Sequence, residues 1–173
     1  KTTESVSKSS VTLPSGSTSD MANAGLSVTI ETSTGTFDLD NNALKSIAGA
    51  GSGSVELSAE QLNADGLSDA NKELVGDHPV FDLNITVGGT NVTDFGDGTV
   101  TVSLPYTPAD GENTDNLTVY YIDADGNAVK MDGAYYDEDT GSIVFETDHF
   151  STFAVVCEQS DTVFIDVTTD DWY

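Results

Sequence analysis

The sequence predicts a mainly β fold, an antiparallel β-sandwich with two or three short helices at its edges. From Val80 onward, apolar and polar residues alternate with a period of two in several short rows. Turns rich in glycine and aspartate separate the rows, for example at residues 96–98, 123–127 and 137–141. Short strands at near-regular spacing are typical of two packed antiparallel sheets.

The N-terminal part of the chain contains an internal repeat within residues 11–58. The aligned pairs are Leu13 with Leu39, Ala22 with Ala48, Ala24 with Ala50 and Gly25 with Gly51, all at an offset of 26. Each copy indicates a strand, a short helix, a glycine stop and a second strand. Two copies are too few for a solenoid, so we interpret the repeat as a duplicated strand–helix–strand unit inside one domain.

The repeat predicts helices at residues 18–23 and 41–48, and Asp40 is the expected N-cap of the second helix. Residues 49–54, rich in glycine and serine, are expected to form a flexible turn between the copies. A third helix is expected at residues 69–75, with Ser68 as its N-cap and Gly76 after its end.

The alternating rows predict a β meander over residues 80–156. The members of one face are Phe81, Leu83, Ile85 and Val87; Val100, Val102 and Leu104; Leu117, Val119 and Tyr121; Ile143 and Phe145; and Phe153 and Val155. Residues 11–157 are therefore expected to form one immunoglobulin-like sandwich module with a single core, although two packed halves are the alternative. Residues 1–10 are expected to be a linker or an edge strand.

The composition excludes several classes of partner. Thirty acidic residues against five lysines and no arginine give a formal net charge of −25. Such a surface repels phosphate backbones and anionic lipid, so we expect neither nucleic acid nor a membrane as a partner. The only cysteine is Cys157, so no intramolecular disulfide can form.

Three segments occur in a characteristic order: DFGDGTVTVSLPY at residues 94–106, LTVYYID at 117–123 and DHFSTFAV at 148–155. Together they resemble a β-rich module of large surface proteins of Gram-positive anaerobes, which often precedes S-layer homology (SLH) repeats. Residues 158–173 are interpreted as a linker and the truncated start of an SLH module. The positions similar to an SLH repeat are Phe164, Asp166, Val167 and Trp172.

The resemblance implies a non-catalytic, extracellular structural or spacer module of a protein anchored to the bacterial cell wall. Its partners would be the neighbouring domains of the same polypeptide and, through SLH repeats outside this chain, cell-wall polysaccharide. A carbohydrate- or protein-binding adhesin module is an alternative. The aromatic residues open to that role are Tyr106, Tyr120, Tyr121, Tyr135, Tyr136 and Trp172.

Residues 148–155 also resemble the self-cleavage sites of adhesion receptors and of an autoproteolytic nucleoporin domain. In such a site, a histidine accepts the hydroxyl proton of the serine that follows the scissile peptide. The alkoxide attacks the preceding carbonyl, and water hydrolyses the resulting ester. The resemblance names His149 as the base, Phe150 as the residue whose carbonyl is attacked and Ser151 as the nucleophile. The alternative, an ordinary strand with Phe150 in the core, is favoured by the sequence.

A metal site is the last candidate. Asp123, Asp125 and Asn127 place oxygen atoms at alternate positions, as at the start of a calcium loop. Position twelve of that loop, where a bidentate acid is needed, would be Ala134. A hairpin turn explains these residues better, so we expect no cofactor beyond a weak surface Ca²⁺ ion.

Overall fold

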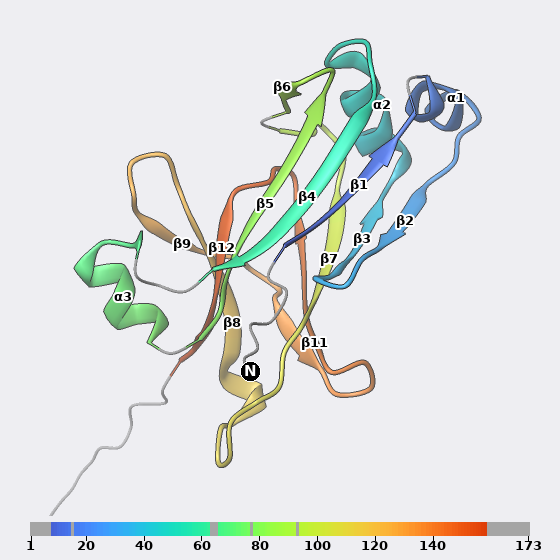
Figure 1. Cartoon of the computed structure of the whole chain (residues 1–173). Helices are drawn as coiled ribbons and strands as arrows, with labels where there is room; N and C mark the ends of the chain where they lie inside the picture. Colours follow the sequence, from blue (N-terminus) through green and yellow to red (C-terminus); the bar gives the residue numbers. More distant parts are fainter. Residues whose placement is uncertain (1–7, 15, 63–65, 77, 93, 159–173) are drawn as a thin grey trace, which may run out of the picture.

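The structure is a computed structural model, and it describes residues 8–14, 16–62, 66–76, 78–92 and 94–158. Two antiparallel sheets lie face to face, which confirms the mainly β sandwich (Figure 1). Sheet A contains β1 (Lys8–Leu13), β4 (Val55–Leu62), β5 (Val80–Val87), β12 (Thr152–Cys157), β8 (Leu117–Ile122) and β9 (Ala128–Lys130) in that order, with β6 (Thr90–Asn91) beside β5. Sheet B contains β10 (Tyr135–Asp137), β11 (Ser142–Thr147), β7 (Val100–Pro105), β3 (Thr36–Leu39) and β2 (Val28–Glu31) in that order.

The duplicated unit appears in the structure as two strand–helix–strand segments. The first is β1, α1 (Ser17–Asn23) and β2, and the second is β3, α2 (Asn41–Gly49) and β4. β1 pairs with β4 in sheet A, and β2 pairs with β3 in sheet B. The first copy therefore crosses from sheet A to sheet B, and the second copy crosses from sheet B back to sheet A. The two helices pack together at one end of the sandwich, which we call the helical end (Figure 1).

Both halves of the chain contribute to one continuous core. Five phenylalanines are almost completely buried: Phe37, Phe81, Phe95, Phe145 and Phe153. They belong to a single apolar cluster that extends from Ala22 to Val155. Burying one such side chain stabilises the fold by about 1.5–3 kcal/mol. The main cluster therefore includes residues of both the duplicated unit and the meander.

The third helix, α3 (Asp69–Val75), covers the outer face of sheet A. Ser68 caps it by accepting a hydrogen bond of 3.3 Å from the amide of Asn71. Val75 packs with Val80, Ala154 and Val156 in a second, smaller apolar cluster. Because Phe153 and Val155 point into the main core, β12 is covered by apolar contacts on both faces.

We call the end of the sandwich opposite to α1 and α2 the base (Figure 1). Lys8, Glu60, Asp82 and Thr152 lie in one row across four neighbouring strands of sheet A. β1 starts at this row and runs toward the helical end, whereas β12 runs from it toward the base. β1 therefore starts near the middle of sheet A, whereas β12 ends toward the base (Figure 1).

The start of α2 is fixed to sheet B through Asp40 and Gly98. One carboxylate oxygen of Asp40 accepts from the amide of Ala43 at 2.7 Å and from the amide of Thr99 at 3.1 Å. Gly98 lies directly against α2, where a Cβ atom would stand 2.7 Å from the carbonyl carbon of Asn42. Only glycine fits this contact, because a Cβ atom at this position would clash with the backbone of α2 rather than with a movable side chain.

We expect Gly98→Ala to lower the free energy of unfolding by about 3 kcal/mol, since the added methyl group must displace either α2 or the turn before β7. Gly49→Ala is the matched control, because a Cβ atom at Gly49 would meet nothing within 4 Å. This control should be neutral or slightly stabilising, since alanine favours the helix. Urea unfolding of both variants measures the difference, and equal stabilities would contradict the contact.

Candidate functional site

The residues of the predicted self-cleavage site form the turn between β11 and β12. Thr147 organises this turn: its hydroxyl donates to the carbonyl of His149 at 2.7 Å and accepts from the amide of His149 at 3.2 Å. The amide of Phe95 donates to the carbonyl of Asp148 at 2.8 Å. Side-chain and backbone hydrogen bonds thus tie the turn to sheet B and to the segment before β7.

Phe150 anchors this turn in the core. Its ring is mostly buried and meets the edges or faces of two other rings, Phe37 at 5.9 Å and Phe95 at 5.2 Å between centroids. Both pairs are T-shaped, the geometry that aromatic rings prefer. Phe150 therefore has the packing role that the ordinary-strand alternative assigned to it.

His149 and Ser151 have different hydrogen-bond partners. The hydroxyl of Ser151 donates to the carbonyl of Ile122 at 3.0 Å. Nδ1 of His149 lies 3.0 Å from a carboxylate oxygen of Asp148, and the imidazole meets the ring of Tyr121 with 4.6 Å between centroids. Proton transfer to the histidine would require Ser151 to leave its carbonyl partner first. Self-cleavage through His149, Phe150 and Ser151 stays a prediction, and this geometry does not favour it.

Two open hollows lie near His149. One, of about 390 Å³, is lined by Tyr121, Met131, Asp148 and His149 among others. The other, of about 460 Å³, lies on sheet B and includes Asp38, Asp40 and Thr101. Thr99 and Glu146 line both. Within the described ranges, no three histidine, cysteine or acidic side chains converge as they would around a metal ion.

The predicted calcium residues occupy the turn between β8 and β9. The carboxylate of Asp123 accepts from the amides of Asp125 at 3.0 Å and Asn127 at 2.8 Å. The amide of Asp123 donates to the carbonyl of Asn127 at 2.9 Å. Asp123 therefore stabilises the backbone of a hairpin turn. A Ca²⁺ ion at Asp123, Asp125 and Asn127 stays a prediction.

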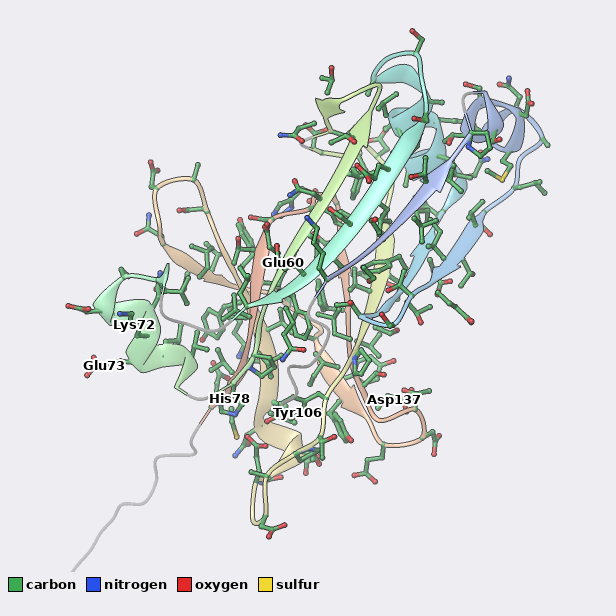
Figure 2. The ribbon with its side chains drawn as sticks, viewed as in Figure 1. Glu60, Lys72, Glu73, His78, Tyr106 and Asp137 are labelled. Carbon is green, nitrogen blue, oxygen red and sulfur yellow. The ribbon has the colours of Figure 1, made fainter. Side chains whose placement is uncertain are left out.

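A partly buried polar network at the base was not predicted from the sequence, which offered only Tyr106, as a surface aromatic residue. Glu112 accepts from the hydroxyl of Tyr106 at 2.6 Å and from the amide of Ala109 at 3.0 Å through one oxygen. Its other oxygen lies 2.6 Å from Nε2 of His78, while Nδ1 of His78 lies 2.7 Å from the carbonyl of Val75. Both ring nitrogens of His78 thus lie next to acceptor oxygens. Figure 2 shows His78 and Tyr106 side by side, and their rings stack at 6.1 Å.

The network shifts the acidity of its members. Burial alone would raise the pKa of Glu112, but hydrogen bonds from Tyr106, His78 and Ala109 outweigh it and bring the pKa to about 2. Burial, together with the hydrogen bond to Glu112, raises the pKa of Tyr106. Burial and the nearby charge of Glu112 also raise the pKa of the Cys157 thiol. The thiol is therefore kept in its less reactive, protonated form.

A second polar contact lies beside the last described residue. Glu158 accepts from the hydroxyl of Tyr120 at 2.7 Å and from Nζ of Lys130 at 2.8 Å. The hydrogen bond to Glu158, followed by burial, raises the pKa of Tyr120 to about 12. The contact from Lys130 is the main cause that lowers the pKa of Glu158. Together these groups hold the end of β12 against β8 and β9.

The tyrosines suggested for an adhesin surface do not lie together on one exposed face. Tyr106 and Tyr120 use their hydroxyls in the contacts with Glu112 and Glu158. Tyr135 is 53% exposed, and the other tyrosines of the described residues are partly buried. Trp172 and the SLH-like residues from Phe164 onward lie outside the described residues.

Comparisons with known proteins give little information about identity. No family model and no solved structure matches the chain. A segment of 92 residues, 53% of the chain, is 34% identical to a protein named "Putative membrane protein" from Evansella cellulosilytica. The match covers only 13% of that relative's length. In the part of the chain that the structure describes, no helix has the length and apolar character needed to cross a membrane.

We expect the Phe150–Ser151 peptide to remain intact, because Ser151 donates to Ile122 rather than to the histidine. Intact mass spectrometry after prolonged incubation should show one species of 18.1 kDa. Ser151→Ala serves as the control for any nonspecific breakage. A fragment that ends at Phe150 in the parent chain and is absent in this variant would contradict the expectation.

Glu112 should contribute to stability in a defined pH range. A carboxyl group whose pKa is lower in the folded than in the unfolded chain stabilises the fold at pH values above its unfolded pKa. For Glu112, this contribution is lost as the pH falls from about 4.5 to about 2. We therefore expect Glu112→Gln to lower the unfolding free energy by about 3 kcal/mol at neutral pH.

Urea unfolding across pH measures this effect. The difference between the parent and Glu112→Gln should shrink as the pH falls through this range. Glu138→Gln is the matched control, because Glu138 is exposed on the turn between β10 and β11. A difference that is constant with pH, or equal in the two variants, would contradict the role of the network.

Proposed function

We propose that this chain is a non-catalytic structural module of a larger bacterial surface protein. The observation that carries the proposal is the single core, to which the duplicated unit and the meander both contribute. Such a core makes the module one rigid body rather than two hinged parts. A rigid body suits a role in holding other domains at a fixed position.

The placement of the chain ends adds detail to this role. β12 ends toward the base, and β1 starts near the middle of sheet A and runs away from the base toward the helical end (Figure 1). We propose that the base faces the neighbouring domains of the same polypeptide. The His78–Glu112–Tyr106 network and the Glu158 contacts stabilise this base, where tension from neighbouring domains would act.

The surface location rests on two kinds of support. The sequence resembles modules that precede SLH repeats, and 53% of the chain is 34% identical to part of a much longer protein whose name refers to a membrane. We propose that the chain lies outside the cell, and that SLH repeats beyond it bind cell-wall polysaccharide. The net charge of −25 is compatible with an exposed, soluble surface.

A fusion protein tests the structural role. A reporter enzyme is placed before the chain and SLH repeats after it, and a glycine–serine linker of equal length replaces the chain in the control. Both fusions should sediment equally with purified cell walls, because the repeats carry the binding. The chain without repeats should stay in solution.

The same fusions test rigidity. Dyes at Lys8→Cys and at Cys157 should report a narrow distance distribution near 20 Å. The strands β1 and β12 are three strand spacings apart, and Cys157 lies five residues beyond Thr152, which is in register with Lys8. The linker control should give a broad distribution. Sedimentation of the isolated chain with walls, or a broad distribution for the module, would contradict the proposal.

A further inference from the structure

The outer edge of sheet A, formed by β1, goes beyond the proposed structural role. β1 pairs with β4 on one side and with no described strand on the other (Figure 1). The amide of Gly88 donates to the carbonyl of Ser54, so every second residue of β4 from this point directs its backbone toward β5. The residues between them face β1. This register leaves the backbone N–H and C=O groups of Lys8, Ser10 and Thr12 pointing away from the sheet.

β1 is the longest and least protected edge strand of the described fold. It has six residues, whereas β2, β9 and β10 at the other sheet edges have three or four. Natural sheets protect their edges with short strands, charged side chains or proline. After Lys8, β1 carries no charge, and the next proline is Pro14, just beyond its end. The edge is therefore open to one further strand.

The two faces of β1 determine which side chains a further strand would carry. Val11 and Leu13 pack against the margin of the main core and are only partly buried. Apolar side chains on the same face of an added strand would remove more of this surface from water. On the other face, Ser10 and Thr12 are exposed, and Thr12 lies opposite Glu56 of β4. An added strand therefore needs apolar residues at every second position.

Charge determines the rest of its composition. Glu60 lies opposite Lys8, whereas Glu56 is exposed and forms no ion pair with any described residue. A strand beside β1 would lie two strand spacings from β4, about 10 Å, so a long basic side chain opposite Thr12 can extend toward Glu56. The net charge of −25 disfavours a second copy of this chain and attracts a basic segment.

From this geometry we propose that β1 binds an extended segment of a partner protein, in which apolar residues alternate with hydroxyl-bearing and basic residues. The segment adds to sheet A as an antiparallel strand, with backbone hydrogen bonds to Lys8, Ser10 and Thr12. Backbone pairing supplies the affinity, and the alternating side chains supply the specificity. The interaction is independent of the proposed structural role, because β1 runs from the middle of sheet A to the helical end and leaves the base free.

A probe peptide, Thr-Val-Lys-Val-Thr-Val-Ser, tests the proposal with the full chain. Antiparallel to β1, this peptide places its lysine opposite Thr12 and its valines opposite Ser9, Val11 and Leu13. Titration followed by amide NMR should give saturable shifts along β1, with a dissociation constant on the order of 1 mM or lower. Amide hydrogen exchange should slow at Ser10 and Thr12, because their N–H groups gain acceptors.

Changes to the backbone distinguish strand addition from attraction by charge. Ser10→Pro removes an outward N–H and no hydrogen bond to β4, so we expect binding about tenfold weaker or lost. Ser10→Ala keeps the backbone and should bind like the parent chain. A probe methylated on the backbone nitrogen of its lysine should fail to bind, whereas methylation at its central valine should be tolerated. This pair of probes leaves the protein unchanged, so it does not depend on the folding of a variant.

Changes of charge complete the test. Glu56→Gln should weaken binding about twofold to fivefold, whereas Glu138→Gln, at an exposed turn, should leave it unchanged. A probe with glutamate in place of lysine should not bind. The proposal is overturned if the probe gives no saturable shifts, if a scrambled probe of the same composition binds equally, or if Ser10→Pro binds like the parent. It is also overturned if the β1 shifts follow protein concentration alone, as pairing between two copies would require.

Discussion

The rest of the structure depends on one apolar layer that lies between two antiparallel sheets. Phe37 and Phe145 enter it from sheet B, and Phe81 and Phe153 enter it from sheet A. A close-packed layer of this kind fixes the register of every strand, since a shift of one residue would turn the apolar row toward solvent. The helices, turns and polar contacts are then placed by strands whose positions are already determined.

The two ends of the sandwich are closed in different ways. At the helical end, the duplicated unit crosses twice between the sheets, and Asn41 joins its copies by donating to the carbonyls of Ala22 and Leu26. At the base, closure depends on the carboxylate of Glu112, which accepts a hydrogen bond from Tyr106 and lies 2.6 Å from Nε2 of His78. The first end is held mainly by packing and neutral hydrogen bonds. The second depends on protonation, because a protonated Glu112 can no longer accept through both oxygens.

Much of the fold could be predicted from local patterns in the sequence. The period of two located β5, β7, β8, β11 and β12, and Asp40 and Ser68 cap the helices as expected. These predictions succeed because strand alternation and helix capping depend on residues close together in the chain. Residues 49–54, expected as a flexible turn between the copies, show the limit: Gly49 ends α2, residues 50–54 lie inside the second copy before β4, and Gly53 packs tightly against Gly88.

The candidate sites show the same limit more strongly. Glu112 and His78 are separated by 34 residues, and no local pattern indicates that they meet. The short order of His149, Phe150 and Ser151 suggested chemistry, but the partner of the Ser151 hydroxyl comes from Ile122 on another strand. Adjacent positions in a sequence therefore do not establish that two side chains face each other. Contacts between residues far apart in the sequence decide which polar groups form hydrogen bonds with each other.

The position of β12 in sheet A has a consequence for biogenesis. This strand, the last one among the described residues, lies between β5 and β8, so sheet A consists of two separate parts until residues 152–157 are available. Closing the sheet also brings together segments far apart in the chain, which makes folding slow relative to local structure formation. A growing polypeptide consequently leaves sheet A divided until β12 has been synthesised, so its two parts can associate only after the ribosome has passed residue 157.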